Sequence, residues 1–324
     1  MSPIVATVVL ASTCQNLLLE PRKALTWETN QWVSGEIDPG IAWVDVVPSW
    51  DAEGTESGGH VEVKIEREGE KYSFGPWSLR ERTSIENQKG SAGALYTDTF
   101  VPSVSGGVAK FTVTLVAGPD GVMPRLRWLR LAFSAGKSED VPWRGEAIEA
   151  LAVPIRAQGD YPGGNVLCSP TSVSMVLNYW AKQLNRPQLD ADVPIVQACV
   201  HDVAWKGTGN WAFNTAFATT RPGLSAYVAR LANVNTLEEW LKKGVPVITS
   251  VSYGLLKGKP VRDDNDGHLV VAVGVDRDGN IMFNDPGKKP NRLTYGRQAF
   301  ERAWAVSNNT VYLIHPDRWD VPAL

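Results

Sequence analysis

The chain has 324 residues, of which 43% are hydrophobic and 21% charged, and this composition excludes a disordered chain, a collagen and a long coiled coil. The formal net charge is -3 and the positive residues form no long run, so a general binder of nucleic acid or anionic membranes is not expected. A chain of this length is expected to form two domains.

Residues 1–150 are predicted to form an all-β domain of the sandwich or jelly-roll type. The apolar run Ile4–Ala11 is interpreted as a first strand, because it lacks the basic flank of a signal peptide and is too short to cross a bilayer. Alternating runs at 61–66, 109–116 and 125–134 predict further strands, separated by clusters of turn-forming residues. The many tryptophans of this half either fill its core, which is the favoured interpretation, or form a stacking platform for sugars or peptides.

Residues 151–324 are predicted to form a second, α+β domain. The segment 169–184 carries apolar residues on one helical face, with Ser169 as its N-cap and Pro170 at the first helical position. The other predicted elements are helices at 236–244 and 297–305 and strands at 245–253, 268–276, 280–285 and 310–316. A helix followed by an antiparallel sheet is typical of an α+β fold.

Three cysteines, Cys14, Cys168 and Cys199, are too few and too widely spaced for a disulfide framework or a metal knuckle. Cys168 directly precedes the first predicted helix, where the helix dipole and free backbone N–H groups favour the thiolate over the thiol. The same N–H groups are suited to stabilise an oxyanion. Taken alone, Cys168 is better explained as a buried structural cysteine. Cys199 lies in an apolar stretch and is predicted to be inert, and Cys14 is not placed beside a base.

His268 and Asp285 supply the partners that a nucleophilic cysteine requires. His268 opens one predicted strand and Asp285 ends the next, so the hairpin between them places the two side chains on neighbouring strands. Asp285 is then able to orient the imidazole and fix its tautomer. Each residue alone has a plain explanation, as a solvated turn histidine or a strand-ending aspartate. With Cys168 on a helix N-terminus, the three predict a papain-type triad.

These segments together resemble papain-like cysteine peptidases, and most closely the bacterial cysteine peptidase family thirty-nine. The segments that carry the resemblance are Gln158, Tyr161–Gly164, Cys168–Ser172, Asp266–His268 and Asn284–Pro286, and in the first half Pro48–Ala52 and Thr97–Phe100. The resemblance covers roughly 150–316 and implies a papain-like catalytic domain behind a β-rich domain. It also implies that Cys168 is the nucleophile, His268 the general base and acid, Asp285 its orienter and Gln158 the side-chain oxyanion donor.

Two features depart from that family. Gln158 precedes the cysteine by ten positions instead of about six, so it is either the oxyanion donor or a surface residue. The chain contains no Walker motif, so export of leader peptides is not implied.

Three aromatic residues of the second half are candidates for a substrate cleft. Trp205, Trp211 and Tyr227 follow the Cys168 helix in sequence and either line such a cleft or pack in the core. Core packing is the favoured interpretation for each of them.

The acidic side chains near the predicted site are interpreted as solvated. Asp263, Asp264 and Asp266 form an acidic loop beside His268, for which binding of a cation or of basic substrate groups is the alternative. Asp202, next to His201, is predicted to lie at the surface.

The sequence therefore predicts a cysteine-type hydrolase that cleaves a peptide or amide bond through an acyl-enzyme, without a metal or organic cofactor. An acyl- or glutamyl-transferase with the same triad is one alternative. A non-catalytic binding protein that uses its aromatic-rich β domain for peptide or glycan contact is another. Neither a nucleic-acid partner nor a membrane span is expected, and the localisation stays open.

Overall fold

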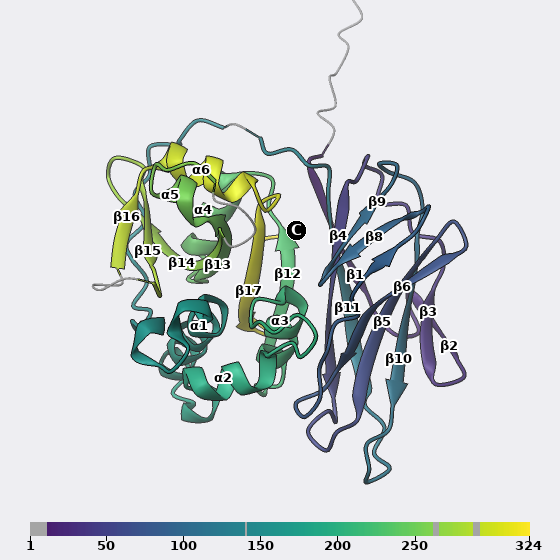
Figure 1. Ribbon diagram of the computed structural model, residues 1–324. Helices are drawn as coiled ribbons and strands as arrows, with labels where there is room; N and C mark the ends of the chain where they lie inside the picture. Colours follow the sequence, from purple (N-terminus) through teal and green to yellow (C-terminus); the bar gives the residue numbers. More distant parts are fainter. Residues whose placement is uncertain (1–11, 140, 262–265, 288–291) are drawn as a thin grey trace, which may run out of the picture.

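A computed structural model describes residues 12–139, 141–261, 266–287 and 292–324 (Figure 1). The strand predicted at Ile4–Ala11 and the side chains of Asp263 and Asp264 lie outside these ranges. Within them the chain is mostly β-sheet, and all its α-helices begin at or after Cys168.

The first half forms two antiparallel sheets. The first sheet has the order β1-β11-β4-β9-β8-β7, with β1 (Cys14–Leu19), β4 (Asp45–Glu53), β7 (Gln88–Lys89), β8 (Gly93–Tyr96), β9 (Thr99–Pro102) and β11 (Arg125–Ser134). The second has the order β2-β3-β10-β5-β6, with β2 (Leu25–Glu28), β3 (Gln31–Ser34), β5 (His60–Arg67), β6 (Glu70–Trp77) and β10 (Lys110–Val116). Buried and half-buried residues alternate along β5, so one face of the second sheet belongs to a core.

Aromatic pairs join these two sheets. Tyr72 of β6 lies 4.9 Å from Phe100 of β9, measured between ring centroids, and Trp50 of β4 lies 6.5 Å from Trp77 of β6. Trp43, Trp50 and Trp77 are fully buried. The core interpretation therefore holds for these three tryptophans.

The second half contains one antiparallel sheet with helices on both of its faces. Its order is β12-β17-β13-β14-β15-β16, with β12 (Leu224–Arg230), β13 (Val247–Ser252), β14 (Gly267–Val275), β15 (Ile281–Asn284), β16 (Arg292–Tyr295) and β17 (Thr310–Pro316). The helices are α1 (Cys168–Gln183), α2 (Val193–Val200), α3 (Trp211–Thr219), α4 (Val234–Lys242), α5 (Tyr253–Leu256) and α6 (Arg297–Ala305), with 3-10 turns η1 (Gln158–Asp160), η2 (Gly164–Val166) and η3 (Pro187–Leu189). In Figure 1 the helices α1 to α3 lie in the lower part of this half and α4 to α6 in the upper part. Every residue of β13 is buried, as expected for a strand covered on both faces.

Side chains of the first half hydrogen-bond to the outer backbone groups of the edge strand β12, which lies beside that half in Figure 1. The backbone N–H of Val228 donates to Ser49 Oγ at 3.2 Å. Asn16 accepts from the backbone N–H of Arg230 at 2.9 Å and donates to its carbonyl at 2.8 Å. The outward backbone groups of an edge strand, which otherwise attract another strand, are thus used within the chain.

A buried ion pair lies beside this edge. Arg230 Nη2 is 2.7 Å from Asp45 Oδ1, and both residues are almost fully buried. Asn308 donates to the other oxygen of Asp45 at 2.5 Å. The two halves therefore share one polar cluster in addition to their apolar contacts.

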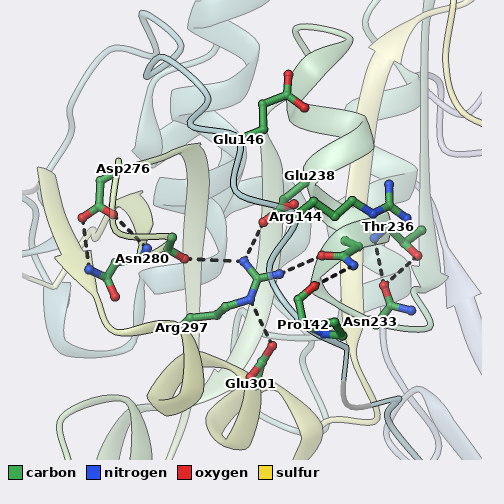
Figure 2. Close-up of polar contacts among 12 residues, drawn as sticks. Pro142, Arg144, Glu146, Asn233, Thr236, Glu238, Asp276, Asn280, Arg297 and Glu301 are labelled. Atoms are coloured by element: carbon green, nitrogen blue, oxygen red, sulfur yellow. Dashed lines mark hydrogen bonds and ion pairs between the residues drawn. The ribbon is translucent and has the colours of Figure 1, made fainter.

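The segment that connects the halves is fixed along α4 (Figure 2). Arg297 of α6 forms an ion pair with Glu238 at 2.6 Å and donates to Asn235 Oδ1 at 2.8 Å. Asn235 in turn donates to the carbonyl of Pro142 in the connecting segment at 3.3 Å. Further along, Ile148 and Val275 exchange two backbone hydrogen bonds, so the connection is part of the folded structure.

Candidate active site

Cys168 is the first residue of α1, one position earlier than the sequence predicted. Leu167 is the N-cap, so the prediction of Ser169 as N-cap is wrong. The hydroxyl of Ser169 is instead 3.0 Å from the hydroxyl of Tyr312 on β17, and this contact removes it from a capping role. Without a side-chain cap, the first N–H groups of α1 remain next to the thiol of Cys168.

One hydrogen bond couples α1 to the strand that carries His268. Ser172 lies one helical turn after Cys168 and donates to the carbonyl of Leu269 at 3.1 Å. His268, the preceding residue, is buried near the start of β14. Its imidazole lies close enough to Cys168 to lower the pKa of the thiol. Local packing of helix on sheet therefore brings together two residues that are 100 positions apart.

Asp285 follows β15, the strand paired with β14, and its side chain is fully buried. Asp285 Oδ1 lies 2.8 Å from His268 Nε2 and accepts the backbone N–H of Gly287 at 2.8 Å. The structure thus brings Cys168, His268 and Asp285 together, and Nδ1 is the ring nitrogen of His268 that Asp285 does not use.

The surroundings of these three groups favour charged forms. Burial raises the pKa of the Cys168 thiol, but hydrogen bonding and the charge of His268 outweigh it, so this pKa is lowered. Burial lowers the pKa of His268, yet its bonds to Asp285 and Cys168 raise it to about 9. Burial likewise raises the pKa of Asp285, and His268 more than reverses that effect. The arrangement therefore shifts the three groups toward thiolate, imidazolium and carboxylate.

Gln158 lies next to Asp285 through its backbone. Its N–H donates to the carbonyl of Pro286, the residue after Asp285, at 2.8 Å. Its carbonyl packs so closely on Gly164 that no side chain fits there. Two 3-10 turns, η1 and η2, thus shorten the path over the ten positions that separate Gln158 from Cys168. Within the described ranges the side-chain amide of Gln158 has no hydrogen-bond partner, and its Oε1 is buried.

Two tyrosines that the sequence analysis did not single out contact Asp285. Tyr295 donates to Asp285 Oδ2 at 2.8 Å and Tyr253 donates to the same oxygen at 3.3 Å. The ring of Tyr253 also lies 4.0 Å from that of His268. The sequence signal that could have indicated them is their position: Tyr253 ends the strand predicted before that of His268, and Tyr295 follows the strand predicted to end at Asp285.

The other candidates take different places. Trp205 is 48% exposed and lies over the backbone of Gly207, whereas Tyr227 is buried against His315 away from Cys168. Trp211 is half-buried and stacks under Arg230 at the junction of the halves.

Two acidic residues predicted to be solvated are in fact buried. Asp266 accepts from the backbone N–H of Gly254 at 2.9 Å and from the hydroxyl of Ser252, so it holds the start of α5. The prediction of a surface Asp202 is wrong, because this side chain accepts from the backbone N–H of Ser84 at 2.9 Å and from Asn210 at 3.0 Å. Asp202 therefore links the second half to the first.

Comparison with known proteins identifies the class. The family described as Peptidase_C39 like family matches residues 150–312, and the one described as Peptidase C39 N-terminal domain matches residues 5–134. A crystal structure from Bacillus anthracis, described as C39-like, is 18% identical with a TM-score of 0.42, over 52% of this chain and 98% of that chain. A search of curated proteins found no significant match.

The chain is a cysteine-type peptidase, a hydrolase. More particularly, it belongs to the Peptidase_C39 like family, and its first half matches the N-terminal domain described for that family. The resemblance inferred from the sequence motifs is thereby confirmed. In the ranges that the structure describes, no helix has the length and apolar character needed to cross a bilayer.

Proposed function

We propose that the enzyme cleaves a peptide or amide bond with Cys168 as nucleophile, His268 as general acid and base, and Asp285 as the orienter of His268. The observation that carries this proposal is the position of His268, whose Nε2 lies 2.8 Å from Asp285 Oδ1 and which lowers the pKa of the Cys168 thiol. A base held between a nucleophile and a third orienting group is the arrangement that activates a thiol.

The reaction proceeds in two steps. The Cys168 thiolate attacks the carbonyl carbon, and the resulting oxyanion accepts hydrogen bonds from the Cys168 N–H and the side-chain amide of Gln158. The imidazolium of His268 protonates the leaving amine, the C–N bond breaks and a thioester remains. The neutral imidazole then takes a proton from water, whose oxygen displaces the thiolate and releases the acid. With an amine in place of water, the same site is an acyltransferase, and product analysis with added amine distinguishes the two.

We expect iodoacetamide to alkylate Cys168 rapidly at pH 6 and at least about 100-fold more slowly in His268→Ala, because an ordinary thiol of pKa about 8.5 is almost fully protonated there. Mass spectrometry of digests taken across a pH series gives the rates. Cys14 and Cys199 in the same digests are internal controls, since burial raises the pKa of both thiols. A wild-type Cys168 that reacts only above pH 8 contradicts the proposed triad.

The same charges set the pH range of turnover. His268 must be protonated to release the amine, and its pKa is raised to about 9. Activity is therefore expected to hold below pH 9 and to fall as the pH rises through that value, and a pH series of peptide hydrolysis measures this.

Gln158→Ala is expected to lower kcat for peptide hydrolysis by about 100-fold, because one oxyanion donor is removed. Alkylation of Cys168 by iodoacetamide forms no oxyanion and is expected to stay at the wild-type rate. Measuring both in one preparation separates the proposed role from a general disturbance of the site. A variant with wild-type kcat would show that Gln158 is not the oxyanion donor.

We further propose that the chain divides near residue 150 into a sandwich-like β domain (1–150) and a papain-like catalytic domain (151–324). The gap between the two family matches, which end at 134 and begin at 150, supports this boundary. The aromatic pairs between the first two sheets support the sandwich, and packing of the Cys168 helix against the His268 strand supports the papain-like fold.

The first half offers a place for the peptide or glycan contact that we propose for it. A cavity of about 530 Å³ is lined by Trp27, Trp32, Arg22 and Arg125 above buried leucines. Trp27 is 46% exposed and meets Trp32 edge to face at 5.0 Å. The exposed indole of Trp27 and the half-buried indole of Trp32, beside guanidinium groups, suit a ligand with a flat apolar face and an acceptor group.

A further inference from the structure

We propose that Tyr295 and Tyr253 are positioning residues of the active site: Tyr295 fixes the carboxylate of Asp285 toward His268, and Tyr253 holds the plane of the imidazole. This inference rests on the proposed triad and adds to it two side chains that do not touch the substrate.

The buried carboxylate of Asp285 is held by donors on both oxygens. Oδ1 is shared by His268 Nε2 and the backbone N–H of Gly287, both at 2.8 Å. Oδ2 receives the hydroxyls of Tyr295 at 2.8 Å and Tyr253 at 3.3 Å. Because the tyrosines occupy Oδ2, the carboxylate has one favoured orientation, in which Oδ1 faces the imidazole.

Tyr253 has a second contact, with the ring of His268. The two ring centroids are 4.0 Å apart and the planes are inclined by 33°. The ammonium group of Lys257 lies 3.1 Å from the ring centroid of Tyr253. A stacked ring limits rotation of the imidazole and excludes water from its bond with Asp285, and such bonds are stronger when water is excluded.

Four neighbouring strands supply this arrangement. Tyr253 follows β13, His268 lies on β14, Asp285 follows β15 and Tyr295 ends β16, and these strands are adjacent in the sheet. The strand pair β14 and β15, which holds His268 and Asp285, therefore lies between β13 and β16, whose ends hold the two tyrosines. The order of the sheet, and not local sequence, assembles the group.

Among the residues that the structure describes, the charged and titratable groups around His268 are Cys168 from α1, Asp285 after β15, and Tyr253 with Lys257 from the α5 segment. Burial and the nearby carboxylate of Asp285 raise the pKa of both tyrosines well above the ordinary value. Their hydroxyls thus remain hydrogen-bond donors throughout the range in which the enzyme works.

The test is alkylation of Cys168 by iodoacetamide across a pH series in Tyr295→Phe, which removes only the hydroxyl. A hydrogen bond to a charged group is typically worth a change of about 10-fold or more. We therefore expect alkylation at pH 6 to be about 10-fold slower than in wild type and the two rates to converge near pH 9, where the thiolate forms without help. A purely structural role lowers the thermal midpoint but does not shift this profile.

Tyr72→Phe is the matched control, since it removes a hydroxyl that donates to the carboxylate of Glu70 in the first half at 2.5 Å. Its profile is expected to match wild type. Tyr253→Phe keeps the stacked ring and is expected to change the rate by about 2-fold or less, since its hydrogen bond is long. Tyr253→Leu removes the ring and is expected to slow alkylation at pH 6, which keeps the test decisive if Tyr295→Phe does not fold.

The outcomes separate the two proposals. If wild-type Cys168 reacts at pH 6 and both Tyr295→Phe and Tyr253→Leu follow the wild-type profile, the positioning role is wrong and the triad stands. If wild-type Cys168 reacts only above pH 8, the triad fails and the positioning role fails with it.

Discussion

Peptide hydrolysis is expected to disappear in Cys168→Ala, because Cys168 is the described cysteine that interacts with His268. Loss of a nucleophile in a triad typically costs on the order of a million-fold in kcat. Since Cys168 lies only half-buried at the start of α1, the free energy of unfolding is expected to change by about 1 kcal/mol or less. Cleavage of a peptide library followed by mass spectrometry, with urea unfolding of the same sample, measures both.

Cys199→Ala is the matched control for this result. Cys199 is also half-buried, near the end of α2, and has no contact with His268. Its activity is expected to equal that of wild type. Turnover by purified Cys168→Ala would refute the assignment of the nucleophile.

Arg230→Met is expected to lower the free energy of unfolding strongly, because it leaves Asp45 buried beside the junction of the halves without its ion-pair partner. Breaking a buried ion pair by removal of one partner typically costs about 3–5 kcal/mol. Because Arg230 ends β12 and Asp45 begins β4, both halves lose stability together. Urea unfolding followed by tryptophan fluorescence is expected to show one transition with a lower midpoint.

Arg125→Met is the control for this change. Arg125 lies 2.6 Å from Glu53, but the two side chains are 74% and 53% exposed, so loss of the pair is expected to leave the midpoint unchanged. Equal midpoints for Arg230→Met and wild type would show that the buried pair does not stabilise the junction. Two separate transitions in wild type would show that the halves unfold independently.

The elements that the sequence predicted well are those with a clear repeat. The helix predicted at 169–184 is found at Cys168–Gln183, and the helix predicted at 297–305 is found at those bounds, because each has one apolar face. The helix α3 was not predicted, since nearly all of its residues are buried and it shows no polar face. In β4, Ser49 and Asp51 resemble a loop in sequence but are buried against the second half.

The same distinction applies to the site. Cys168, His268 and Asp285 were predicted because their order along the chain and the hairpin between the last two already indicate proximity. Tyr295 was not, since its contact with Asp285 depends on how β16 is placed beside β15. Asp202 was misread because its partners Ser84 and Asn210 come from two halves of the chain.

Asn16 and Ser49 of the first half hydrogen-bond to the backbone of β12. The two halves therefore associate through non-covalent contacts that do not require an unbroken backbone. Besides its own hydrogen bonds to the second half, the connecting segment keeps one half at a high local concentration near the other. A polypeptide cut between 134 and 150 is therefore expected to remain a single particle, and the two pieces to find each other when produced from separate genes. The contact between the halves therefore resembles the interface of a heterodimer, although both halves belong to one chain.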